Sequence, residues 1–111
     1  MDGIFLKKEE FMKEIEGCKL PQVFEQNLLD KAEEMFGKWG LTRHMDEKEH
    51  LFKSAGLVSK PGDSEALKKE KEALRCLCTK IMEAKLNRQD AATIIKNFNK
   101  INEPDFEWVD R

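Results

Sequence analysis

Residues 64–86 hold the longest helical pattern in this chain of 111 residues. With successive helical side chains about 100° apart, six of its apolar residues share one arc. These residues are Leu67, Leu74, Leu77, Cys78, Ile81 and Met82. Ser64 is suited to cap the first turn, and Asn87 is suited to stop the helix at its other end. Because an amphipathic helix gains most of its stability by packing its apolar face, this stretch predicts a core of helices around it.

The rest of the sequence supplies shorter helical patterns and no strand-rich segment. Apolar residues recur at helical spacing in four further ranges, 2–16, 21–40, 41–55 and 87–103. The segment 56–63 contains Pro-Gly and is predicted to be a loop. We therefore predict an all-α fold, a compact bundle of about five helices packed around the long central helix. Residues 1–103 would form a single helical domain, and residues 104–111 an extended acidic and aromatic C-terminal tail.

The three cysteines, Cys18, Cys76 and Cys78, do not have the spacing of a disulfide framework. Cys76 and Cys78 would be about 200° apart on a helix, so they cannot bind one metal ion from the same face. We expect Cys78 to be a buried thiol and Cys76 an exposed one. Nothing near Met1 resembles a signal peptide, and no apolar run is long enough to span a bilayer. The sequence thus predicts a cytoplasmic, reducing location and no membrane contact through a spanning helix.

Arg43 and His50 form a pair with a spacing that is typical of one class of enzyme. Six residues separate them, and this arrangement resembles the motif of HEPN-type ribonucleases. The resemblance implies an all-helical, usually dimeric ribonuclease in which the histidine and arginine handle proton transfer and phosphate charge. Three acidic residues, Asp46, Glu47 and Glu49, lie between the two and oppose the approach of a polyanion.

Basic residues on the polar side of range 87–103 are the other candidate nucleic-acid contacts. They are Arg88, Lys96 and Lys100. The chain has a net charge of −2 and lacks a dense basic cluster with interleaved aromatic residues, so a solvated helix face is the favoured interpretation. The sequence also lacks a glycine-rich phosphate loop, a nucleophile elbow and a metal-spaced cluster. We therefore expect neither a cofactor nor a metal.

Four large apolar residues are candidates for contact with a partner protein. Trp39 is expected either to fill a junction between helices or to face the partner. Phe106, Trp108 and Val109 lie among acidic residues in the tail. They are expected either to dock on their own bundle or to act as a short linear motif for another protein.

Together these patterns favour a non-catalytic, intracellular protein–protein interaction module that acts as an adaptor, regulator or inhibitor. A homodimer that pairs through the 64–86 helix is a further expectation. The alternative is a small helical nucleic-acid-binding protein or a HEPN-like ribonuclease that uses Arg43 and His50. The alternative requires these two side chains to converge on one cleft, whereas the first interpretation lets them diverge.

Overall fold

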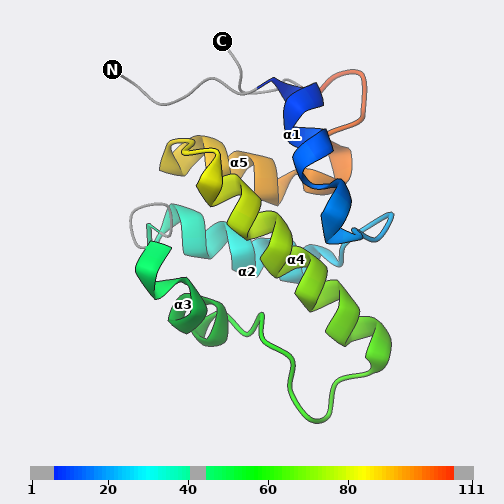
Figure 1. Cartoon of the computed structure of the whole chain (residues 1–111), viewed down its shortest axis with the longest axis vertical. Coiled ribbons are helices and arrows are strands. Elements are labelled where there is room, and N and C mark those ends of the chain that lie inside the picture. The colour runs from blue at the N-terminus through cyan, green and yellow to red at the C-terminus, as the bar shows by residue number, and fades with distance from the viewer. Residues whose placement is uncertain (1–6, 41–44, 107–111) are drawn as a thin grey trace.

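All regular structure in the described residues is helical. The computed structural model describes residues 7–40 and 45–106. The α-helices are α1 (Lys8–Glu14), α2 (Gln26–Gly37), α3 (Lys48–Ser54), α4 (Glu65–Glu83) and α5 (Arg88–Lys96). The described residues also form three short 3-10 helices, η1 (Glu16–Cys18), η3 (Met45–Glu47) and η4 (Phe98–Lys100). The prediction of a compact all-α bundle is confirmed (Figure 1).

Helix α4 is the longest element and crosses in front of α2 and α5 in Figure 1. The Ser64 side chain accepts a hydrogen bond from the Leu67 amide at 3.1 Å, so the expected cap is present. The inward face of the helix is closed to solvent along its second half. Its fully buried residues are Leu74, Leu77, Cys78 and Ile81, each with 0% exposure. The apolar arc read from the sequence is therefore the part of α4 that forms the core.

Helices α2 and α5 pack closely along each other, and both contribute to the same core as α4. A Cβ atom added at Gly37 of α2 would lie 3.7 Å from the Cβ atom of Ala92 on α5, so the two helices approach closely there. The Asn99 side chain also donates to the Phe24 carbonyl and accepts from the Phe24 amide, both at 2.8 Å. The segment before α2 is thus bound to η4, which follows α5.

Several helix boundaries differ from the predicted ones, and side-chain hydrogen bonds lie at two of them. The second helix begins at Gln26 rather than at Pro21, because both backbone groups of Phe24 bind Asn99 instead of entering a helix. The fifth helix ends at Lys96, although its pattern continues toward residue 103. There the Asn97 side chain and the Asn97 backbone amide both donate to the Thr93 carbonyl, each at 3.1 Å.

The loop before α4 is held in place by a mostly buried ion pair. Lys71 Nζ lies 2.7 Å from Asp63 Oδ2, and their side chains are 7% and 13% exposed. The same carboxylate oxygen accepts a hydrogen bond from the Lys60 amide at 2.9 Å. Asp63 therefore closes the turn and neutralises a lysine that α4 brings into its packed face. The hydrogen bond from Lys71, and then that from Lys60, hold the pKa of Asp63 below its usual value.

This lowered pKa predicts a specific loss of stability in acid. A carboxyl whose pKa is depressed by folding stabilises the folded state above its unfolded pKa, here 3.8, and this contribution disappears as pH falls through the folded value. Asp63→Asn should therefore lower the Tm at about pH 6, and the difference from wild type should shrink steadily below about pH 4. Thermal unfolding followed by circular dichroism measures both.

Glu65→Gln is the matched control, because it removes an 84% exposed carboxylate from the start of the same helix. It should change the Tm little at either pH. An Asp63→Asn difference that stays constant down to about pH 2 would show that the ion pair contributes no pH-dependent stability.

A second prediction tests the central position of α4. Leu74→Ala should lower the free energy of unfolding by about 3 kcal/mol, because it leaves a cavity in a fully buried site. Leu74→Asp should prevent folding, because it buries a charge without a partner. Lys69→Ala changes an exposed residue of the same helix and should cost less than about 0.5 kcal/mol. Urea denaturation gives the free energies for the two alanine variants and shows whether Leu74→Asp has an unfolding transition. A stably folded Leu74→Asp protein would contradict this packing.

Candidate functional site

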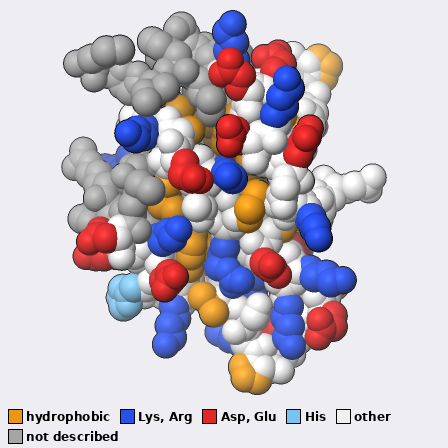
Figure 2. Space-filling model, viewed as in Figure 1, with side chains coloured by type: hydrophobic (Ala, Val, Ile, Leu, Met, Phe, Trp, Pro, Cys, Tyr) orange, Lys and Arg blue, Asp and Glu red, His pale blue; other side chains and the backbone are white. Residues whose placement is uncertain are grey.

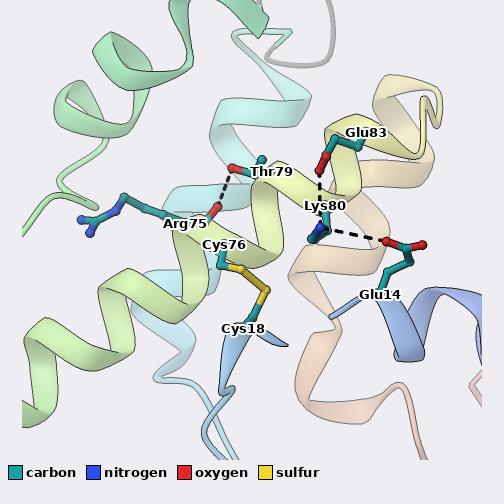
Figure 3. The surroundings of a disulfide bond; sticks show 7 residues. All are labelled: Glu14, Cys18, Arg75, Cys76, Thr79, Lys80 and Glu83. Atoms are coloured by element: carbon teal, nitrogen blue, oxygen red, sulfur yellow. Dashed lines mark hydrogen bonds and ion pairs between the residues drawn. A yellow bond between two sulfur atoms is a disulfide. The ribbon is translucent and has the colours of Figure 1, made fainter. Parts of the chain in front are cut away.

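A disulfide joins η1 to the middle of α4. Cys18 and Cys76 are 58 positions apart in sequence, and their Cα atoms are 5.6 Å apart (Figure 3). The expectation that Cys76 is a free, exposed thiol is therefore wrong. The reason is tertiary, since the pairing depends on how η1 lies against α4. Cys78 is the buried free thiol that the helical spacing predicts, and its burial raises its pKa.

Ion pairs on the next turn of α4 connect that helix to α1. Lys80 Nζ lies 4.0 Å from Glu14 Oε2 on α1 and 3.7 Å from Glu83 Oε1 on α4 (Figure 3). Arg75 projects from the other side of α4, toward α3 (Figure 3). One side of α4 therefore contacts α1 through Lys80, and the other side, which carries Arg75, faces α3.

The side of α4 that faces α3 borders a groove of about 480 Å³. Its lining residues are Lys48, Glu49, Phe52, Lys53, Val58, Arg75, Cys76 and Thr79. Val58 is 37% exposed, whereas Phe52 belongs to the core and is only 5% exposed, so these two form an apolar floor that is partly open. Three cations, Lys48, Lys53 and Arg75, stand around this floor against a single carboxylate.

Two hydrogen bonds fix the α4 wall of this groove. Arg75 Nη1 donates to the Leu57 carbonyl at 2.8 Å, which connects the α3–α4 loop to the wall. Thr79 Oγ1 donates to the Arg75 carbonyl at 2.9 Å, so both lone pairs of the hydroxyl oxygen are left to accept. The guanidinium still has further N–H donors for a ligand, because Arg carries five. The wall is therefore positioned before any ligand binds.

A second cavity, of about 470 Å³, lies on the η1 side of the disulfide. Its lining residues are Gly17, Cys18, Lys19, Lys69, Glu72, Ala73 and Cys76. Cys76 therefore borders both cavities, whereas Cys18 borders this one and is only 7% exposed.

The predicted partner contacts are spread over the molecule. Trp39 follows α2 and is 37% exposed, and it does not line the α3–α4 groove. Phe106 is half-buried against the core of its own bundle. Trp108 and Val109 lie outside the described residues.

The predicted catalytic pair is not brought together by any described contact. His50 is exposed on α3, and Arg43 lies outside the described residues, so their convergence stays a prediction. Glu49, one of the acids between them, lines the α3–α4 groove.

The predicted nucleic-acid residues are exposed along α5 and η4. Lys96 and Lys100 share a polar cavity of about 290 Å³ with Asp30, and Lys96 Nζ lies 3.7 Å from Glu33 Oε2. Arg88 starts the helix and lies near Gly40 instead. On the face drawn in Figure 2, basic and acidic side chains are interspersed. These lysines therefore have acidic neighbours and do not form a continuous basic surface.

The α3–α4 groove was not predicted from the sequence. Its lining comes from two helices and the loop between them, and most of its residues look like ordinary solvated positions in a helical pattern. One signal was present. Val58 lies in the loop between Gly56 and Pro61. A large apolar residue in such a loop is a candidate for contact with the core or with a partner.

The disulfide predicts a large contribution to stability. A link across 58 positions removes conformational freedom from the unfolded chain. On a chain-entropy model this raises the free energy of unfolding by about 4 kcal/mol. The double variant Cys18→Ala/Cys76→Ala should lose free energy of unfolding of this order, measured by urea denaturation without reductant.

The matched comparison is the wild-type chain in reductant, which should lose a similar amount, while the double variant should not respond to reductant. A double variant as stable as the oxidised wild type would contradict this contribution.

Comparisons with protein-family models, with curated proteins and with solved structures gave no match. Over residues 7–40 and 45–106, no group of histidine, cysteine and acidic side chains is arranged to hold a metal ion. None of the helices in those ranges has both the length and the apolar character that crossing a bilayer requires. The surface chemistry of the bundle itself is therefore the guide to function.

Proposed function

We propose that this protein is a non-catalytic protein-interaction module, an adaptor, regulator or inhibitor, that binds an acidic, amphipathic segment of a partner in the α3–α4 groove. The observation that carries the proposal is the pairing of an apolar floor with a cationic rim. Phe52 and Val58 offer apolar contact, and Lys48, Lys53 and Arg75 offer positive charge around it. A segment with a large apolar side chain flanked by carboxylates is complementary to both.

The size and mixed chemistry of the groove favour a peptide segment over a polyanion. About 480 Å³ is enough for one or two large side chains and falls within the usual range for ligand sites. Glu49 at the rim would repel phosphates but can accept hydrogen bonds from backbone amides of a bound segment. Arg75 is already oriented by Leu57, so less entropy is lost when it binds a carboxylate.

The proposal also includes contacts outside the groove, and a homodimer is a further possibility to weigh against the structure. Trp39, Phe106, Trp108 and Val109 are candidates for secondary contacts outside the groove. A homodimer through α4 has less support, because Leu74 is fully buried in its own bundle and cannot also pair with a second copy. The nucleic-acid alternative gains no observation in its favour from the described residues.

An intracellular location stays part of the proposal. The Cys18–Cys76 disulfide weakens the further expectation that this location is permanently reducing, because such bonds persist in oxidising surroundings.

Selection from a phage-displayed library of random twelve-residue peptides tests the proposal directly. Enriched peptides should combine Asp or Glu with a large apolar residue. Val58→Asp places a carboxylate on the apolar floor and should weaken binding of a selected peptide on the order of tenfold or more. Fluorescence polarisation with the labelled peptide measures the affinity.

Val23→Asp is the control, because Val23 is 65% exposed and lies outside the groove. It should leave the affinity unchanged within about twofold. Enrichment of basic peptides, or full affinity in the Val58→Asp protein, would overturn the proposal.

A further inference from the structure

The two residues of the Cys18–Cys76 disulfide differ in how far they are buried. Cys76 is half-buried and borders a cavity on each side, whereas Cys18 is 7% exposed. A thiolate that attacks one sulfur of a disulfide approaches it in line with the S–S bond, from the side opposite the sulfur that leaves. The α3–α4 groove is lined by Cys76 and not by Cys18, so a small thiolate in this groove meets Cys76 alone.

Positive charge surrounds the bond on both sides. The groove contributes Lys48, Lys53 and Arg75 against Glu49. The η1-side cavity contributes Lys19 and Lys69 against Glu72. Cations in the groove attract an anionic thiol, and cations beside Cys18 stabilise the thiolate that leaves.

We propose that this disulfide is an exchange site for small anionic thiols, with Cys76 as the residue that is attacked. The incoming thiolate forms a bond to Cys76 Sγ while the Sγ–Sγ bond breaks. The electron pair leaves with Cys18 Sγ, which takes a proton from water. A second thiolate then attacks the sulfur of the bound thiol and releases Cys76. The protein gains two electrons in all, and the two thiols are oxidised to their own disulfide.

The third cysteine does not interfere with this exchange. Cys78 is fully buried, and burial raises the pKa of its thiol, so it stays protonated and out of reach of the groove. Only Cys18 can displace the bound thiol from within the chain, and that step simply reverses the exchange. A mixed disulfide on Cys76 should therefore form without rearranging to Cys78. This inference does not depend on the partner proposed above.

Three reagents with the same two-carbon spacing test the proposal on the oxidised full chain. They are 2-mercaptoethanesulfonate, 2-mercaptoethanol and cysteamine, which carry negative, zero and positive charge. Rates are expressed per thiolate and followed by alkylation and intact mass. The anionic reagent should react on the order of tenfold faster than the cationic one at low salt, and added salt should reduce this ratio. Peptide mapping should place the mixed disulfide on Cys76.

The double variant Lys48→Gln/Lys53→Gln should lower the ratio of anionic to neutral rates several-fold. Lys13→Gln/Lys100→Gln removes two exposed lysines that line neither cavity and should leave that ratio unchanged. Three results would each overturn the proposal. These are a rate independent of thiol concentration, which means that the chain must first unfold, a mixed disulfide on Cys18, and equal rates for the three reagents.

Discussion

The burial of one face of α4 is the interaction on which the rest of this structure depends. Leu74, Leu77, Cys78 and Ile81 are closed to solvent, and each of the leucine and isoleucine side chains contributes on the order of 2 kcal/mol when removed from water. Helices α2 and α5 contribute to the same core, and α1 is connected to α4 through η1. The buried face of α4 therefore completes the core that α2 and α5, which pack closely along each other, also line.

The opposite face of α4 carries the residues for which we propose a function. Cys76 lies about 200° around the helix from buried Cys78, and it is half-buried in its disulfide with Cys18 of η1. Arg75 and Thr79 follow on the same side and form one wall of the α3–α4 groove. The proposed docking site and the proposed exchange site therefore share one helix face, whose rigidity comes from the core behind it.

The helices could be predicted from the sequence because their signals are local. Periodicity located α4, and the Ser64 side chain caps it as expected, whereas the Asn87 side chain caps the start of α5. Features made by distant segments could not be read in this way. The Cys18 partner of Cys76 is 58 positions away, and the start of α2 depends on Asn99. The groove likewise requires the placement of α3 against α4, which no local pattern specifies.

Native-state hydrogen exchange resolved by residue tests the central role of α4 most directly. Amides from Leu74 to Ile81 should exchange only through global unfolding, with a free energy equal to that from urea denaturation. Amides of the short helix α3 should exchange through smaller local openings. If the α4 amides exchange as readily as those of α3, then α4 is not the element that holds the bundle together.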